Sequence, residues 1–219
     1  MAIRTVLSQL EPYSTLSGEQ LDWLVDRCRI RHLQAHEVLL HDGSPVTNAY
    51  ILTAGYLMRS IYSPEGACVL LNDTHPVTSF GCAAAFYEGP HAGVVEAVRP
   101  SEVVMVPLDA IQELFAQSPA FALAMARTLA RSSVRQTEFV RELLFPVPVR
   151  VARYLCRRRD VGAPEELEMS KTALAEMLAT VPETLSRALG TLRSQGLVEV
   201  NGRAVRVLDA AALRAYAQL

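Results

Sequence analysis

The sequence predicts an α+β fold, with a β-rich N-terminal domain, one long helix and a C-terminal helical domain that ends in a hairpin. Three observations support this prediction. Short apolar runs separated by turn signals occupy residues 28–107. Residues 120–145 then contain neither Gly nor Pro, as a long helix requires. Two short amphipathic segments and a hairpin signal follow within residues 170–207, which is the plan of a winged helix-turn-helix.

The overall composition favours a soluble protein of two modest domains. The 219 residues are enough for two cores, and no apolar run is long enough to span a bilayer. The N-terminus lacks the features of a signal peptide, and no C-x-x-C spacing occurs among Cys28, Cys68, Cys82 and Cys156. We therefore expect a cytoplasmic protein with no membrane association. No nucleophile–base or metal-ligand spacing recommends an enzyme.

The charge is distributed unevenly along the chain. Residues 1–146 hold 10 Lys and Arg against 15 Asp and Glu, a net charge of −5. Residues 147–219 hold 11 against 8, a net charge of +3. A basic C-terminal part is what attraction to nucleic-acid phosphates requires.

The β-rich region follows one short helix. Residues 14–27 place Leu21, Leu24 and Val25 at helical spacing, with Ser17 as a candidate N-cap. The runs with strand character are Arg29–Leu33, Glu37–Leu40, Ala49–Leu52, Tyr56–Tyr62, Ala67–Leu71, Val94–Ala97 and Glu102–Val106. The turn signals are Asp42–Pro45, Ala54–Gly55, Ser63–Gly66 and Arg99–Ser101. This pattern predicts a β-sandwich or barrel, with the Ala-rich Gly81–Tyr87 as a helical insertion.

The long helix begins at Ser118-Pro119, which has the pattern of an N-cap followed by a helix-opening proline. We expect about 26 residues of helix from there to Pro146. One stripe is Phe121, Met125, Thr128, Ser132, Arg135 and Phe139, and the next is Ala122, Leu129, Gln136 and Leu143. A helix with two such stripes needs more cover than one small β-domain provides. We therefore expect a homodimer formed through residues 118–143.

The C-terminal domain begins where Phe145–Pro148 breaks the long helix. Val149–Arg159 follows as an amphipathic helix, and a Gly-Ala-Pro loop comes next at residues 162–164. The Asn201-Gly202 pair near the end of the chain predicts a β-hairpin.

Between these elements lies the helix-turn-helix. Ser170 can cap its first helix, Ala179–Val181 forms the turn, and Pro182 opens the second helix. The buried stripe of the second helix is Leu185, Leu189 and Leu192.

Three polar side chains face away from that stripe near the start of the second helix, where such helices contact base edges. Arg187 can bond guanine bidentately, Glu183 can accept from cytosine N4, and Ser186 can contact a base edge. We expect these residues to bind double-stranded DNA, with neighbouring contacts from Ser170, Lys171 and Thr184.

Each of the three residues also has a purely structural explanation. Glu183 stabilises a helix N-terminus, through the macrodipole or in a capping box with Thr180. Ser186 fits an ordinary surface serine, and Arg187 fits an i, i+4 pair with Glu183. The coincidence of all three within a basic winged helix favours DNA recognition.

The segment Glu183-Thr184-Leu185-Ser186-Arg187 resembles the E-T-x-S-R motif of the fumarate–nitrate-regulator branch of the CRP/FNR transcription factors. Asp42–Gly55 resembles the β-roll signature of this family, and the resemblance covers nearly the whole chain. It implies a β-roll sensor, a jelly roll of the cyclic-nucleotide-binding type, at residues 1–117. It also implies a dimerisation helix at 118–145 and a winged-helix DNA-binding domain at 146–219.

The resemblance further implies the DNA target and partners. A dimer would read a TTGAT-like half-site twice in a palindrome, through Glu183, Ser186 and Arg187. Ser186 stands where the cyclic-AMP branch usually has Gly, and Pro182 is found in some nitric-oxide-responsive members. Ala179 replaces the Gly common in the turn. RNA polymerase is an expected partner if the protein activates transcription.

The nucleotide-binding residues of the family are missing. The family binds the ribose with a Gly-Glu-Leu segment and the cyclic phosphate with an Arg-Ser or Arg-Thr pair. The corresponding segments here are Phe80–Ala84 and Pro90–Ala92. Cys82 replaces the glutamate and no arginine remains, so burial of a cyclic phosphate would be costly and cyclic AMP is not expected. An iron–sulfur cluster needs four thiolates, and the related regulators cluster three of them near the N-terminus, where this chain has only Cys28, so this cofactor is not expected either.

Haem is the remaining family precedent, with a His or Cys as axial ligand. The candidate residues of the effector pocket are Cys82, His91, His75 and Cys68. Inert packing of the cysteines and a loop position for His91 are the structural alternatives. His32, His36 and His41 fall on different strands or faces, so no metal site is expected.

Three other modes of action stay open. The protein can be constitutive and controlled by abundance, or it can sense redox state through Cys82 or Cys68. A β-roll module that regulates a protein partner is the alternative outside DNA binding.

Overall fold

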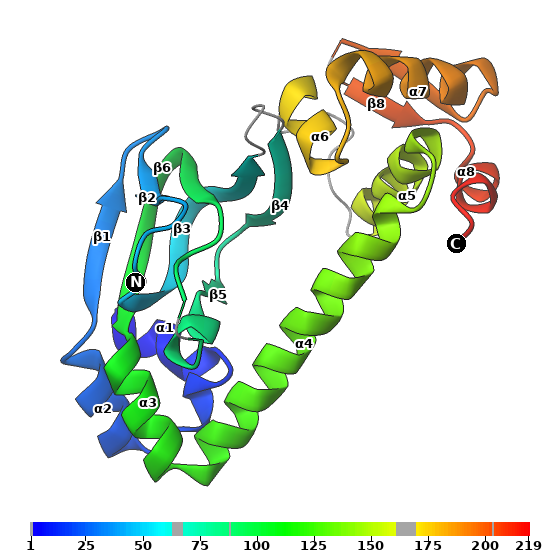
Figure 1. Cartoon of the computed structure of the whole chain (residues 1–219). Helices are drawn as coiled ribbons and strands as arrows, with labels where there is room; N and C mark the ends of the chain where they lie inside the picture. The colour runs from blue at the N-terminus through cyan, green and yellow to red at the C-terminus, as the bar shows by residue number, and fades with distance from the viewer. Residues whose placement is uncertain (1, 63–67, 88, 161–169, 203) are drawn as a thin grey trace. The chain divides into compact units, whose positions relative to one another are not determined.

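The computed structural model describes residues 2–62, 68–87, 89–160, 170–202 and 204–219, and of residues 72 and 73 only the backbone (Figure 1). The chain forms two compact units, one with residues 1–61 and 71–136 and the other with residues 62–70 and 137–219. Each unit has its own apolar core. None of the helices among these residues is both long and apolar enough to cross a membrane.

The first unit starts with helices α1 (Ile3–Gln9) and α2 (Gly18–Val25), joined through a 3-10 turn at Tyr13–Thr15. The predicted cap of α2 is confirmed. The Ser17 hydroxyl accepts from the backbone N–H of Gln20 at 3.2 Å, and the Gln20 side chain accepts from the Ser17 N–H at 3.1 Å. This reciprocal pair satisfies two backbone donors that the start of a helix leaves open.

A six-stranded sheet confirms the β-rich N-terminal domain. Its strands are β1 (Arg29–Leu33), β2 (Val38–Leu40), β3 (Asn48–Tyr62), β4 (Cys68–Thr74), β5 (Thr78–Phe80) and β6 (Val94–Pro107). The order is β1-β6-β3-β4, with β2 paired to β6 and β5 paired to β3. The helical insertion is a 3-10 turn at Cys82–Ala85, after Gly81 with φ +81°.

The prediction of chain turns at Ala54–Gly55 and Arg99–Ser101 is wrong. These residues lie inside β3 and β6, where the pairing register shifts near Ala54 and Tyr56. Gly55 has φ +99°, and a Cβ on it would lie 2.5 Å from the Ser101 Cα. The Ser101 hydroxyl accepts from the Tyr56 N–H at 3.0 Å. The glycine therefore marks a bulge where two long strands cross closely, a feature that resembles a turn in local sequence.

Two apolar clusters fill the first unit. One cluster lies inside the sheet and consists of Leu33, Leu39, Leu40, Tyr50, Leu52, Leu57, Val95, Ala97 and Val103. The other joins the sheet to the helices and includes Leu7, Tyr13, Leu24, Ile51, Cys82, Ile111, Phe121 and Met125.

The segment after β6 forms α3 (Leu108–Gln117), followed by the predicted long helix α4 (Pro119–Leu143), which has 25 residues. The Ser118 hydroxyl accepts from the Phe121 N–H at 3.3 Å, so Ser118-Pro119 opens α4 as predicted. Phe121 and Met125, the first members of the expected stripe, are fully buried in the core of their own unit. They are therefore not available to a partner.

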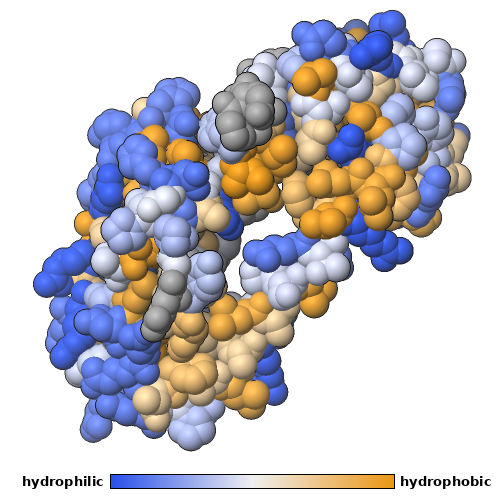
Figure 2. Space-filling view, viewed as in Figure 1, coloured by the Kyte–Doolittle hydropathy of each residue, from blue (hydrophilic) through white to orange (hydrophobic). Residues whose placement is uncertain are grey.

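A different face of α4 is apolar and exposed. Leu123 and Val140 are 55% and 59% exposed, and Ala126 and Ala130 are also exposed. Leu144, directly after the helix, is more exposed still. On the face seen in Figure 2, apolar and weakly polar side chains line the first half of α4.

The second unit is a winged helix-turn-helix, as predicted. Its elements are α5 (Val147–Asp160), α6 (Lys171–Met177), α7 (Pro182–Ser194), β7 (Val198–Asn201), β8 (Ala204–Val207) and α8 (Ala210–Tyr216). β7 and β8 are antiparallel, and Asn201 pairs with Ala204, which leaves Gly202 in the hairpin turn with φ +62°. The Gly-Ala-Pro loop expected at 162–164 lies outside the described residues.

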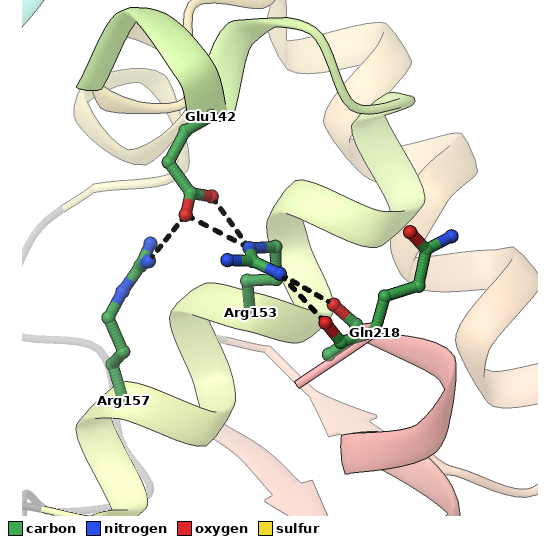
Figure 3. A network of polar contacts seen from close by, with 5 residues as sticks. Glu142, Arg153, Arg157 and Gln218 are labelled. Atoms are coloured by element: carbon green, nitrogen blue, oxygen red, sulfur yellow. Dashed lines mark hydrogen bonds and ion pairs between the residues drawn. The ribbon is translucent and has the colours of Figure 1, made fainter. Parts of the chain in front are cut away.

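A polar network joins the end of α4 to α5 and to the end of the chain (Figure 3). Arg153 Nε donates to both oxygens of the Glu142 carboxylate, and Arg157 Nη1 donates to one of them at 3.0 Å. Arg153 Nη1 donates to the backbone oxygens of Ala217 and Gln218 at 2.9 and 3.3 Å. The Arg153 guanidinium also lies 4.7 Å from the centre of the Phe145 ring.

Candidate nucleic-acid interface

The turn between α6 and α7 is closed by backbone hydrogen bonds. The Thr180 N–H donates to the Ala175 oxygen at 2.8 Å. Ala179 has φ +48°, in the left-handed region that glycine adopts at lower cost. Val181 is extended and Pro182 opens α7, where a missing N–H is tolerated. The predicted turn at Ala179–Val181 is confirmed.

Arg150 of α5 braces this turn. Its Nη1 donates to the Ala179 oxygen at 3.4 Å, and burial lowers the pKa of its guanidinium below the usual value. No local sequence signal marks Arg150 for this role, because only the folded chain brings it to a turn that begins 29 residues later.

The two faces of α7 differ sharply. Leu185, Leu189 and Leu192 are buried in the core of the second unit. Glu183, Ser186 and Arg187 are exposed on another face, near the start of the helix. The structure therefore presents these three side chains together to solvent.

Two of the structural explanations for Glu183 and Arg187 do not apply. The N-cap residue of α7 is Val181, whose side chain makes no capping hydrogen bond, so Glu183 and Thr180 form no capping box. Arg187 Nη2 donates to the Thr184 hydroxyl at 3.0 Å. Glu183 and Arg187 form no ion pair in the part of the chain that the structure describes.

The other expected contact residues lie at the start of α6 and on α7. The Ser170 hydroxyl accepts from the Ala173 N–H at 3.1 Å and so caps α6. Lys171 is the first residue of α6 and is half-buried, as is Thr184 on α7.

A hollow of about 160 Å³ lies between α6, α7 and β7. Its lining residues are Lys171, Ser186, Leu189, Gly190, Arg193 and Val200. Neither Lys171 nor Arg193 makes a side-chain hydrogen bond or ion pair with the described residues. Gly190 and Arg193 were not among the residues expected at the interface.

In the first unit, Cys82 belongs to the packed core. Its Sγ lies 3.7 Å from the Tyr13 hydroxyl and 3.4 Å from the Ser79 hydroxyl. Tyr13 is fully buried, and this burial raises the pKa of its hydroxyl well above the usual value. A thiol held in this way is part of the packing between the sheet and the helices.

His91 lies in a different setting, beside Arg59. The His91 Nε2 is buried and has no hydrogen-bond partner among the described residues. Burial, and then the nearby Arg59 guanidinium, lower the pKa of His91. Arg59 donates twice to the Ala92 oxygen, at 3.2 and 2.9 Å.

An arginine from elsewhere in the chain therefore lies beside residues 90–92, although this segment itself contains none. Arg59 reaches this segment from β3, because the pairing of β3 with β6 places Arg59 opposite Val95. Strand pairing over 36 residues could not be derived from the local pattern.

The four expected effector residues are not brought together. His75 is exposed, with its ring 4.8 Å from that of Tyr56, and Cys68 is half-buried on β4. His36 and His32 lie beside separate carboxylates, Glu96 at 3.0 Å and Glu102 at 3.9 Å. Within the described ranges, no three His, Cys, Asp or Glu residues are placed to share a metal ion.

Comparisons with known proteins agree with this architecture. The Cyclic nucleotide-binding domain family matches residues 30–118, and the Crp-like helix-turn-helix domain family matches residues 149–216. The chain is 23% identical to the cAMP-activated global transcriptional regulator CRP of Haemophilus influenzae, over 95% of this chain and 96% of the relative. It is 26% identical to the Anaerobic regulatory protein of Pasteurella multocida, over 94% and 79%. The structure of FixK2 from Bradyrhizobium japonicum has the same fold, with a TM-score of 0.73 at 20% identity over 86% of this chain and 96% of that chain.

Proposed function

Because this chain is a DNA-binding transcription regulator of the CRP/FNR family, we propose that it binds a palindrome of two TTGAT-like half-sites as a homodimer. The observation that carries the proposal is the joint exposure of Glu183, Ser186 and Arg187 on one face of α7. The protein has no enzymatic role in this proposal.

The chemistry of the three side chains matches such a half-site, which contains a single G·C pair. Arg187 presents two parallel donors for guanine O6 and N7, and Glu183 presents an acceptor for the N4 amino group of cytosine. The Thr184 hydroxyl accepts from Arg187 and so limits the positions of its guanidinium. Ser186 lies beside them for a further base-edge contact, and Ser170 and Lys171 lie at the start of α6 for the phosphate backbone.

The exposed face of α4 supports the homodimer. Leu123, Ala130 and Leu144, which directly follows the helix, fall on one seven-residue series that has a threonine at position 137. Ala126 and Val140 fall on a second series that has a serine at position 133. All five are exposed in the single chain. A seven-residue apolar repeat is the pattern by which two helices pair along their length. We assign residues 1–117 to sensing, 118–145 to dimerisation and 146–219 to DNA binding.

For the effector we propose a ligand other than cyclic AMP, or none. Cys82 offers no carboxylate for a ribose and is packed in the core. Arg59 is already bonded to the Ala92 oxygen, where a cyclic phosphate would need a free guanidinium. RNA polymerase would be the further partner of an activator.

Haem is the second candidate, favoured by the buried and unbonded Nε2 of His91. The low pKa of His91 keeps the imidazole neutral, as an axial ligand must be. Cys82 does not fit this role, because its thiol bonds Tyr13 within the core. Bound haem would supply a gas-binding or redox-active iron. A Soret band in wild-type protein supplied with haem, lost in His91→Ala, would support this candidate, and an unchanged spectrum in His91→Ala would remove it.

A mobility-shift titration tests DNA reading. The full chain is titrated, with and without reductant, against TTGAT-N4-ATCAA and against the same duplex with both G·C pairs inverted. We expect the protein to bind the first duplex tightly and the inverted duplex with much lower affinity. Equal affinity for both duplexes would contradict the proposed base reading.

A further inference from the structure

Gly190 occupies an unexpected place in α7. Glycine in a helix interior is less favourable than alanine, because it has more backbone freedom to lose. Packing does not require it here, since a Cβ at Gly190 would meet no heavy atom within 4 Å. Its backbone also lies outside the left-handed region. Nothing within the described chain therefore explains the missing side chain.

The absent side chain opens the hollow between α6, α7 and β7. Lys171 and Arg193 stand at this hollow together with Ser186. Both cations are without a hydrogen bond or ion pair to the described residues. An uncompensated pair of cations beside a hollow is suited to an anion that comes from outside the chain.

The hollow is continuous with the base-reading face. Ser186, Gly190 and Arg193 are spaced by four and three residues, so they follow one another along the same side of α7. Glu183 begins this side one turn earlier. A helix whose first turns enter the major groove brings its later turns past the phosphate backbone.

We propose that this hollow seats one backbone phosphate of the bound DNA, held by Lys171 and Arg193 and admitted close to the helix by Gly190. The proposal rests on the proposed function. It assigns the late part of α7 to fixing the position of the helix on the duplex, whereas Arg187 selects the sequence. Gly190 and Arg193 thereby join the DNA interface.

Gly190→Ala gives the sharpest test, because stability and binding should move in opposite directions. The variant should raise the Tm of the protein by about 2–4 °C, through better helix propensity. The same methyl group should weaken binding to specific and random duplexes alike, by about tenfold. Gly18→Ala is the matched control, since a Cβ there meets only Arg4 Nη2 at 3.9 Å. It should leave DNA affinity unchanged.

Lys171→Gln and Arg193→Gln test the phosphate directly. Affinity falls with salt, so a plot of log affinity against log salt concentration has a negative slope. Each variant should make this slope less steep by about 0.9, on both duplexes. One outcome would overturn the phosphate site alone: the wild type binds DNA, the two glutamine variants keep its salt dependence, and Gly190→Ala binds as tightly as the wild type. The proposed base reading would then still stand. If the wild type binds no duplex in any state, the proposed function fails and the phosphate site falls with it.

Discussion

A single N–H of Arg153, on Nε, lies between the two oxygens of the Glu142 carboxylate, at 2.9 and 3.0 Å (Figure 3). The two side chains are only 15% and 20% exposed. Glu142 is in the last turn of α4, and Arg153 also holds the backbone oxygens of Ala217 and Gln218. One ion pair therefore fixes the end of the long helix against both α5 and the end of the chain.

We predict that Glu142→Gln lowers the free energy of unfolding by about 1–3 kcal/mol, because it leaves the poorly solvated Arg153 without its anion. Urea denaturation followed by circular dichroism measures the change. Arg157→Gln is the control, since Arg157 is 51% exposed and its contact with Glu142 is better screened. Equal losses in the two variants would show that Arg153 does not depend on Glu142.

Arg187→Ala should reduce affinity for TTGAT-N4-ATCAA by about 1–3 kcal/mol and relax the preference for the G·C pair. The physical reason is the loss of two parallel hydrogen bonds to one guanine. Fluorescence anisotropy on the native and G·C-inverted duplexes measures both effects. Arg4→Ala, on α1, should change neither. A uniform loss on both duplexes would place Arg187 on the phosphate backbone instead.

If the protein pairs as proposed, Val140→Glu should convert the dimer to a monomer, because it places a charge on the exposed apolar face of α4. Sedimentation velocity gives the oligomeric state, and circular dichroism shows whether the fold is kept. Glu138→Lys also changes charge but lies about 200° round the helix from Val140, so it should remain dimeric. A dimer in both variants would move the interface away from this face.

The stability of the protein should fall below about pH 6.5 in part through His91. An unfolded chain binds a proton on histidine near pH 6.5, whereas burial and Arg59 lower the pKa of His91 in the folded protein. As the pH falls through 6.5, His91 binds a proton in the unfolded state but not yet in the folded state. The free energy of unfolding therefore decreases. Above that pH both states are neutral and His91 has no effect.

Unfolding free energies of wild type and His91→Gln, compared at about pH 7.5 and pH 5.5, measure this term. The wild type should lose more on acidification than His91→Gln does. His41→Gln, an exposed histidine, should follow the wild type. Parallel curves for wild type and His91→Gln would contradict the effect of burial.

The sequence was sufficient wherever a local rule dictates the structure. Ser17, Ser118 and Pro182 each open a helix, because capping depends on residues only three or four positions apart. The short helices α1 and α8 were missed, since neither extends beyond seven residues of apolar pattern. The winged domain was predictable because Ser170 caps α6, Pro182 opens α7, and α7 carries a leucine stripe.

Long-range pairing accounts for the errors. In the local sequence Gly55 has the pattern of a turn residue. Its role in the fold is to allow the close approach of Ser101, which lies 46 residues later. Arg59 meets Ala92 only through the register of β3 and β6. Gly190 and Arg193 carry no sequence signal of their own, and only the hollow that they line with Lys171 gives them a shared role.

Helix α4 has one end packed in a core and a long exposed remainder, so it has the mechanics of a lever. Phe121 and Met125 anchor the first turns of the helix, where they are buried in the core of the first unit. With 25 residues the helix is about 37 Å long, and a tilt of about 5° at this end displaces its far end by about 3 Å. That displacement is close to the rise of one base pair in DNA, about 3.4 Å. If α4 tilts in this way, a methyl-sized adjustment around Phe121 would be enough, by leverage alone, to shift the proposed recognition helix by about one base pair along the proposed half-site.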